Sequence, residues 1–439
     1  EHGSYEPTVF WNHQCVTSSI VEFEQKILAL TFMNGSRRRL EARLNNESVF
    51  NRRYECMTFD VFARMLVSRR SSLIYNTNDL IKEASRLNEF DKPCFLAAKL
   101  LEVESVQQWV SMSFPLIIVD EAQDLDNYRL GILKGLAQHS HVVAAADEFQ
   151  CLTDERDTSS LLNWLKSKGN CFNLTQPQRT NKQGLLDVAI AIREGHDIIS
   201  CLSKKEFKKK IKWVGPGFKL LEVPATKKNP GVLAWTIANE INVQKGTFAI
   251  ITPHASNSII ISAIEKVGQK QWKYKKNNLV FGPYSIEWDK EDTEQINSLL
   301  TDVELAKLQS ISDIKTNLEP IRSNTAIHQA IIKLDRLRRI SGKKNFSKDE
   351  IIEHIVDALR NQSRMGFLRR GGHLAMTIQR AKNREFENVI VLWPHTITGS
   401  SEHLRRLLYN AVTRSKSHCT VILLGNGRLN SPPFGGNPE

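Results

Sequence analysis

"LIIVDEAQD", from Leu116 to Asp124, joins an apolar run directly to a cluster of carboxylates. A short apolar run bounded by polar residues is typical of a buried strand in a parallel sheet. Ligands of open α/β sheets bind beyond the carboxyl ends of the strands. Asp120 could therefore hold Mg²⁺ beside a nucleotide's phosphates, and Glu121 could orient an attacking water. The alternative is a solvated helix start, because acids also favour the first turn of a helix.

Similar apolar runs recur along the chain and alternate with helical patterns. This alternation predicts an α/β fold built from parallel strands. Two mostly helical stretches, residues 62–113 and 265–372, interrupt the rhythm and are interpreted as insertions. The predicted strands are Ile27–Phe32, Leu116–Val119, Val142–Ala146, Phe248–Thr252, Val389–Trp393 and Thr420–Leu424.

Composition narrows the class of protein. The chain has 439 residues, a formal net charge of +12 and a pI of about 9.3. Its length allows several domains, and its positive charge favours a polyanionic partner such as nucleic acid. The seven cysteines include no CxxC pair, which argues against a zinc site and fits a reducing, cytoplasmic setting. No apolar run is long enough to span a bilayer, so no membrane partner is expected.

Other polar residues add to this pattern. Asp147 and Gln150 follow a predicted strand in the same way, in "ADEFQCL". Arg179 and Arg414 lie further along the chain, in "LTQPQRTN" and "LRRLLYNAVTRSKSH". A glutamine can bridge a γ-phosphate and a neighbouring group because it both donates and accepts hydrogen bonds. Arginines stabilise the charge that develops on a transferred phosphoryl group. Two arginines from a second domain would couple domain closure to hydrolysis.

Taken in order, these segments resemble the motifs of superfamily 1 helicases of the UvrD/Rep/PcrA type. The resemblance implies two RecA-like parallel-sheet domains with helical insertions, in the arrangement 1A, 1B, 2A and 2B. The segments are "ILALTFMNGSRRRLEARL" at Ile27 (motif Ia), "MTFDVFA" at Met57 (Ib), "IIVDEAQD" (II), "AAADEFQCL" (III), "LTQPQRTN" (IV), "TIQRAKNREFENVIVL" (V) and "RRLLYNAVTRSK" (VI).

The resemblance also implies domain boundaries. Residues 1–61 and 114–168 would form a partial domain 1A, with residues 62–113 as a small 1B-like insertion. Residues 169–264 and 373–439 would form domain 2A, with residues 265–372 as a 2B-like insertion.

ATP and Mg²⁺ are the cofactors that the resemblance implies. Asp120 would serve Mg²⁺, Glu121 the attacking water and Gln150 the γ-phosphate, while Arg179 and Arg414 would act as arginine fingers. The further cofactor-binding candidates are Asp147, Glu385 and Tyr409; Tyr409 would either stack near the adenine or support motif VI.

Single-stranded DNA is the partner that the resemblance implies, with RNA as an alternative. Phe32 would stack on a base, and Thr377 with Glu385 would link nucleic-acid contacts to the nucleotide cleft. The other candidate contacts are Thr31, Asn34, Thr58 and Phe59. The basic, aromatic stretch "KVGQKQWKYKKNN" at Lys266 is either a further strand-tracking patch or a solvated face.

The sequence departs from the family pattern at several points. Asp60 stands where motif Ib usually ends in histidine, Gln379 replaces the motif V histidine, and Asn383-Arg384 replaces Gly-Leu. No G-x-x-x-x-G-K-[ST] phosphate loop occurs in the chain. The chain is therefore expected to be either an N-terminally truncated helicase or a degenerate member. On either view, weak or absent ATP hydrolysis and an unpaired edge in the first sheet are expected.

Three functions remain open from the sequence. The first is an ATP-dependent single-stranded DNA translocase or helicase in DNA repair or phage defence. The second is a non-catalytic nucleic-acid-binding or regulatory protein on a degenerate helicase scaffold. The third is an accessory subunit of a repair or defence complex.

Binding to single-stranded DNA is predicted to depend on salt and on Phe32. The positive net charge attracts the phosphates of the strand, and this attraction weakens as the salt concentration rises. Replacing Phe32 with Ala should cost about 1–3 kcal/mol of binding free energy, because a stacked base loses its platform. Fluorescence anisotropy with a labelled oligonucleotide at two salt concentrations measures both effects. An affinity that does not change with salt would contradict the electrostatic part.

Overall fold

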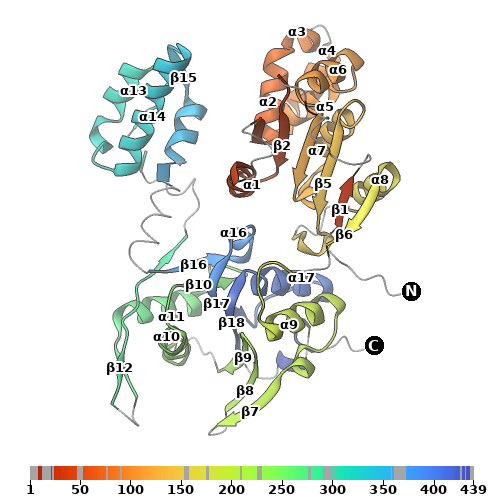
Figure 1. The fold of residues 1–439 in the computed structure, drawn as a ribbon. Coiled ribbons are helices and arrows are strands. Elements are labelled where there is room, and N and C mark those ends of the chain that lie inside the picture. The colour runs from red at the N-terminus through yellow and green to blue at the C-terminus, as the bar shows by residue number, and fades with distance from the viewer. Residues whose placement is uncertain are drawn as a thin grey trace.

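The computed structural model describes two sheet-based lobes and a separate helical unit (Figure 1). The described residues are 8–11, 21, 24–46, 53–75, 78–88, 91–152, 158–174, 177–207, 210–224, 230–274, 278–289, 299–300, 303–356, 358–359, 372–425, 428–430 and 432–435. None of the helices in this part of the chain combines the length and apolar character needed to cross a membrane.

The N-terminal lobe is built on a sheet with the strand order β3-β2-β4-β5-β1-β6. Strands β2 to β5 are parallel, so their carboxyl ends meet at one edge, where Thr31, Thr58 and Asp120 stand in register. The strands are β1 (Thr8–Trp11), β2 (Ile27–Thr31), β3 (Tyr54–Thr58), β4 (Leu116–Asp120), β5 (His141–Ala146) and β6 (Asn170–Asn173).

The prediction of an unpaired edge strand in this sheet is wrong for β5. Strand β1 lies antiparallel between β5 and β6 and pairs with both. Thr8 faces Ala146 on one side and Asn173 on the other, so the backbone groups of β5 find partners within the described chain.

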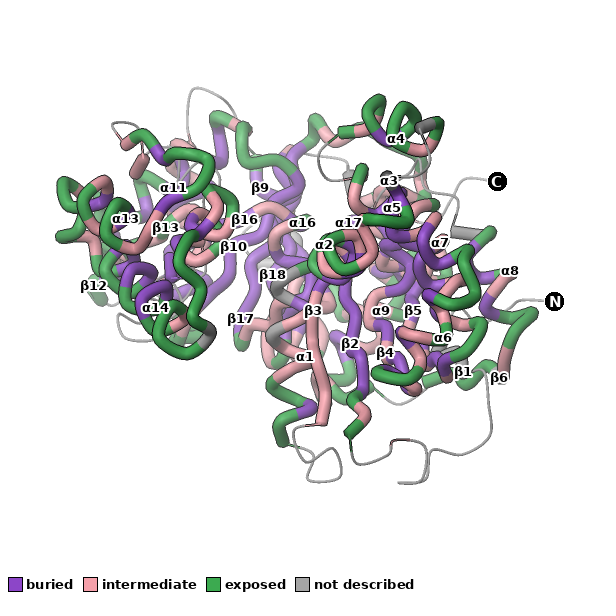
Figure 2. Tube along the Cα trace, turned by 90° about the horizontal axis from the view of Figure 1, so that it is seen from above, coloured by how far each residue is buried: buried purple, intermediate pink, exposed green. Residues whose placement is uncertain are grey.

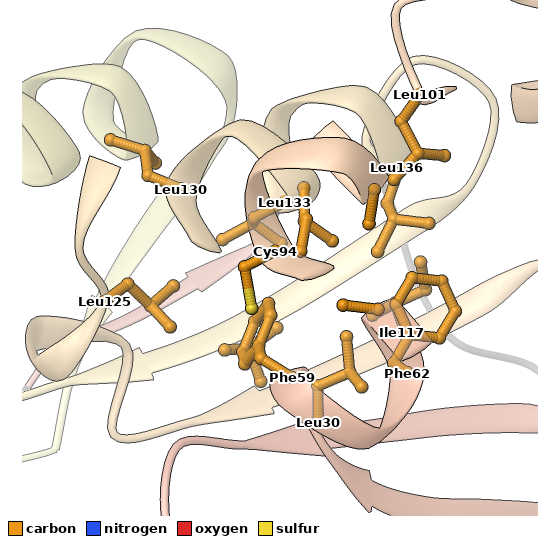
Figure 3. Close-up of a cluster of buried hydrophobic side chains, with 14 of the residues drawn as sticks. Leu30, Phe59, Phe62, Cys94, Leu101, Ile117, Leu125, Leu130, Leu133 and Leu136 are labelled. Carbon is orange, nitrogen blue, oxygen red and sulfur yellow. The ribbon is translucent and has the colours of Figure 1, made fainter. Parts of the chain in front are cut away.

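One face of this sheet carries the main core of the lobe. Phe59 and Phe62 of α2 pack with Leu30, Ile117 and the leucines of α7 (Figure 3). The helices of this lobe are α1 (Asn34–Asn46), α2 (Phe59–Arg69), α3 (Ser71–Tyr75), α4 (Asn78–Ser85), α5 (Asp91–Leu100), α6 (Glu104–Ser113), α7 (Asn127–Leu136) and α8 (Thr158–Lys168), with the short η2 (Ala122–Asp124) and η3 (Glu148–Gln150).

The other face of the same strands is only half-buried. Alternation along β4 and β5 turns Ile118, Val143 and Ala145 away from the main core, and each is of intermediate burial. Together with side chains of α1 they line a cavity of about 140 Å³.

The C-terminal lobe has a sheet with the strand order β13-β16-β10-β17-β18-β9-β8-β7. The strands from β13 to β9 are parallel, and the β9-β8-β7 segment is antiparallel. The strands are β7 (Ser203–Phe207), β8 (Lys210–Gly215), β9 (Phe218–Val223), β10 (Phe248–Thr252), β13 (Ile286–Trp288), β16 (His373–Thr377), β17 (Phe386–Pro394) and β18 (Ser415–Leu424).

Helices cover both faces of this second sheet. One apolar cluster joins the sheet to α9 and α17, and another joins it to α10 and α11. Strand β10 is therefore buried throughout and β18 from Cys419 onward, and these stretches are drawn in purple in Figure 2. The helices are α9 (Gln183–Glu194), α10 (Gly231–Gln244), α11 (Ser258–Gln269), α16 (Ile378–Ala381) and α17 (Ser401–Val412), with η4 (Ile198–Cys201) and η6 (Arg428–Asn430).

The stretch predicted as the second insertion divides into three parts. The hairpin of β11 (Trp272–Lys273) and β12 (Val280–Phe281) packs on the C-terminal lobe, and β13 joins its sheet. A helical unit with its own core stands apart from both sheets (Figure 1). It contains β14 (Leu308–Ser310), α13 (Ile311–Asn317), η5 (Glu319–Ile321), α14 (Thr325–Ser341) and β15 (Asn345–Ser347).

The aromatic residues of the basic stretch at Lys266 are used in packing. Trp272 is buried and stacks on Phe281, with ring centroids 6.0 Å apart. Tyr274 lies 4.7 Å from the same ring and donates a hydrogen bond to Asn239. These contacts favour the anchored, solvated face over a strand-tracking patch.

Candidate functional site

The acidic pair lies where β4 ends, at the edge that faces the C-terminal lobe. The backbone N–H of Glu121 donates to the Asp120 carboxylate at 3.1 Å. Glu121 has φ +58°, a left-handed conformation that is uncommon for a residue with a Cβ and that clusters at functional sites. The side chain of Gln123, fully buried, donates to Glu121 and accepts from the N–H of Asp147 at 2.9 Å. The turn after β4 is thus tied to the turn after β5.

Asp120 is held in an environment that disfavours its charge. Burial and the adjacent Glu121 carboxylate together raise the pKa of Asp120 to about 6. Two neighbouring carboxylates supply the oxygen donors that Mg²⁺ prefers. Water or phosphate would fill the remaining coordination positions. No group of three or more His, Cys, Asp or Glu suited to a metal occurs among the described residues, so a cation here would rely on such extra ligands.

Two arginines from the C-terminal lobe converge on this edge. Arg179 donates to Glu385 at 3.1 Å and to the carbonyl of Thr413 at 2.7 Å. Arg414 is only 1% exposed, and its guanidinium donates across the lobes to the Gln150 amide oxygen at 3.2 Å. The structure therefore brings together the residues that the sequence predicted for one cleft.

The charges of these groups influence one another. Burial and the nearby positive charge of Arg179 lower the pKa of Arg414 to about 10, which still leaves it charged at neutral pH. Burial opposes the ionisation of Glu385, but Arg179 and Lys416 hold the pKa of Glu385 below its usual value. The cleft is thus an electrostatically coupled unit.

Arg39 of α1 is a site residue that the sequence did not single out. Its guanidinium lies 3.9 Å from Asp120, 3.8 Å from Glu121 and 3.7 Å from Glu385, and so joins carboxylates of both lobes. Arg39 is the last of three consecutive arginines on one helix, and no local signal distinguishes it from the other two. Only the packing of α1 beside β4 selects it.

Asp147, which was predicted as a cofactor contact, pairs with groups of both lobes. Its carboxylate accepts from Arg193 at 2.8 Å, from the Gln150 amide at 2.7 Å and from the N–H of Phe149 at 3.2 Å. Arg193 also donates to the Tyr409 hydroxyl at 3.0 Å, and the Tyr409 ring meets Phe149 edge-on. Asp147 therefore orients Gln150 and joins the lobes, and Tyr409 supports this junction.

A second junction joins the turn after β4 to the segment predicted as motif V. Lys382 donates to both oxygens of Asp124 at 2.6 and 2.7 Å, and both side chains are 7% exposed. Beside it, Asn383 donates to Ser36 at 2.6 Å. Sequence reasoning missed both contacts, although Lys382 and Asn383 lie inside the quoted "RAKNRE" segment.

Phe32 is the best placed of the predicted nucleic-acid contacts. Its ring is partly exposed, and the guanidinium of Arg129 lies 5.3 Å from the ring centroid. Arg129 is in turn paired with Asp60 and Asp126 and lies 3.6 Å from Asp91. Asp60, the acid in the place of the usual motif Ib histidine, is therefore paired within the protein, although it shares Arg129 with two other acids.

Two of the other predicted contacts, Thr31 and Phe59, are fully buried. Phe59 is completely buried in the core, so it cannot touch nucleic acid. The side chain of Thr31 is also fully buried and donates to the carbonyl of Met33. Thr58 and Thr377 cap α2 and α16 by accepting from backbone N–H groups. The side chain of Asn34 lies outside the described residues.

Two parallel-sheet lobes with acids, a glutamine and arginines between them are the arrangement expected of a helicase. Residues 74–152 match the family model for the UvrD/REP helicase N-terminal domain, and residues 373–422 match that for the UvrD-like helicase C-terminal domain. Both matches support a UvrD/Rep-type superfamily 1 helicase. No curated protein matches it at a significant level.

Asp120 is expected to lower stability at neutral pH. Its pKa is higher in the folded protein than in the unfolded chain, so its favourable contribution is complete below about pH 4 and is lost as the pH rises through about 6. Asp120→Asn should therefore raise the free energy of unfolding by about 1–3 kcal/mol above about pH 7, and by little below about pH 4.

Urea unfolding across this pH range, with a chelator present, measures the effect. Asp79→Asn, at an exposed position of α4 in the same lobe, is the control. A stabilisation by Asp120→Asn that is equal at both ends of the pH range would contradict the electrostatic explanation.

Proposed function

We propose that this protein is an ATP-dependent translocase or helicase that moves along single-stranded DNA, with RNA as the alternative track. The observation that carries the proposal is the convergence of Asp120, Glu121 and Gln150 with Arg179 and Arg414 between the lobes. The matches to the two helicase domain models support the general activity. A role in DNA repair or phage defence, alone or as a subunit of a larger complex, rests on the resemblance only.

Each group has a role that follows from its position. Asp120 would hold Mg²⁺, which supplies charge neutralisation to the phosphates when bound. Glu121 would orient the attacking water, because its turn is fixed by Gln123 and its carboxylate stands beside that of Asp120. Arg179 and Arg414 would stabilise the transferred γ-phosphoryl group from the opposite lobe.

Gln150 connects the two halves of this arrangement. It donates to Asp147 through its amide nitrogen and accepts from Arg414 through its amide oxygen. A γ-phosphate in the cleft would compete for the Arg414 guanidinium, so Gln150 would lose that contact when nucleotide binds. This exchange of contacts would couple nucleotide binding to the relative position of the two lobes.

The alternative function is a nucleic-acid-binding protein without catalysis. One observation favours it: the chain contains no G-x-x-x-x-G-K-[ST]. In such a protein the ion pairs between the lobes would hold a fixed binding surface, and Phe32 with the positive charge would still bind a strand.

Hydrolysis is expected to be slow, stimulated by single-stranded DNA and dependent on Glu121. Glu121→Gln keeps the shape of the side chain but removes the base, so the rate should fall by about 100-fold or more while DNA binding is kept. Glu104→Gln, at an exposed position of α6, should leave the rate unchanged.

A coupled phosphate-release assay with and without oligonucleotide measures the rates. A rate that is unchanged in Glu121→Gln argues against the assigned role. Strand binding without any hydrolysis by the unaltered chain would favour the non-catalytic alternative.

A further inference from the structure

The cleft carries more positive than negative charge. Five cations, namely Arg39, Arg43, Arg179, Arg414 and Lys416, surround the three carboxylates of Asp120, Glu121 and Glu385. The cations belong to both lobes, and Arg414 is held completely buried although Arg39 and Arg179 repel it. Such an excess favours an anionic ligand, which would relieve repulsion between the guanidinium groups.

A cavity lies next to these charges. It has a volume of about 140 Å³, well above the roughly 10–15 Å³ that one water needs. Its floor is the half-buried face of the first sheet, with Ile118, Val143 and Ala145. Arg39 and Arg43, one helical turn apart on α1, line it together with Asp120. Two guanidinium groups beside this cavity suit an anionic ligand.

The contacts of Arg39 leave its donors available. Its three ion pairs are 3.7 to 3.9 Å long, whereas a charge-assisted N–H···O hydrogen bond is about 2.7–2.9 Å. A guanidinium offers five N–H donors in a planar fork that matches phosphate oxygens. Small movements of a long, partly exposed side chain would exchange loose carboxylate contacts for close phosphate contacts.

We propose that the cavity beside α1 is a polyphosphate subsite, in which Arg39 and Arg43 bind the phosphate tail of a nucleoside triphosphate. This inference rests on the proposed function and adds the residues that hold the nucleotide. Asp120 lines the same cavity, so a Mg²⁺ on that carboxylate would lie beside the phosphates.

The test uses inorganic tripolyphosphate with Mg²⁺ as the probe, measured by calorimetry without nucleic acid. Arg39→Gln and Arg43→Gln should each weaken binding about 10-fold, and the double variant about 100-fold, as expected for hydrogen bonds between charged groups. Arg39→Lys keeps the charge but loses the planar fork of donors. Its affinity for tripolyphosphate should lie between those of Arg39→Gln and the unaltered protein.

Arg37→Gln is the matched control. Arg37 lies on the same helix but pairs with Glu41 at 3.4 Å, and its substitution makes the same charge change away from the cavity. It should alter tripolyphosphate binding by less than twofold. Thermal unfolding of every variant confirms that α1 remains folded.

The outcomes separate this inference from the proposed function. Tripolyphosphate binding that ignores Arg39 and Arg43, or that falls equally in Arg37→Gln, overturns the subsite even where DNA-stimulated hydrolysis depends on Glu121. Binding that depends on Arg39 in a protein that hydrolyses nothing supports the subsite and rejects the enzyme. The unaltered protein failing to bind tripolyphosphate at low salt also overturns the subsite.

Discussion

The buried ion pair between Lys382 and Asp124 sets the geometry between the lobes. Removing two charges from water is costly, and the cost is offset only when both partners are held in close contact. Here both carboxylate oxygens of Asp124 lie within 2.7 Å of the Lys382 ammonium nitrogen. The hydrogen bond from the neighbouring Asn383 to Ser36 fixes the turn that carries Lys382. Because Asp124 closes the turn that begins at Glu121, this pair aligns the acidic pair with the segment that carries Glu385. Losing one partner would leave a buried charge without compensation.

The cleft concentrates features that oppose folding. Asp120 has a raised pKa, Glu121 adopts a left-handed conformation, and Arg414 keeps its charge while fully buried. None of these three features would persist in a surface loop, because water would solvate the charges and the backbone would relax. The apolar cores on either side over-determine the strand ends and so hold the strained groups in place. Groups that reduce stability, held between two stable cores, are expected at a site selected for function and not for stability.

Much of the fold and part of the site follow from the sequence. Apolar runs predicted six strands, each within a few residues of its observed bounds, because fully buried parallel strands exclude polar residues. Strands β3, β9 and β16 were missed, since half-buried or polar positions interrupt them. Acids after β4 and β5 were predicted because parallel strands share one edge, whereas Arg179 and Arg414 were predicted from phosphoryl chemistry and the family resemblance. Arg39, Arg193 and Lys382 were not, because their role arises only when separate elements pack together.

The two lobes repeat one local design but differ in how helices cover their sheets. In each, a central strand ends in a buried threonine that donates to a backbone carbonyl, at Thr31 and Thr252. Each is paired in register with a capping threonine on the next strand, Thr58 or Thr377. The second sheet is covered by helices on both faces, whereas the first leaves a half-buried face beside α1. That asymmetry places an apolar floor within reach of guanidinium groups in the N-terminal lobe, so the nucleotide site is expected on this lobe while the other lobe supplies arginines.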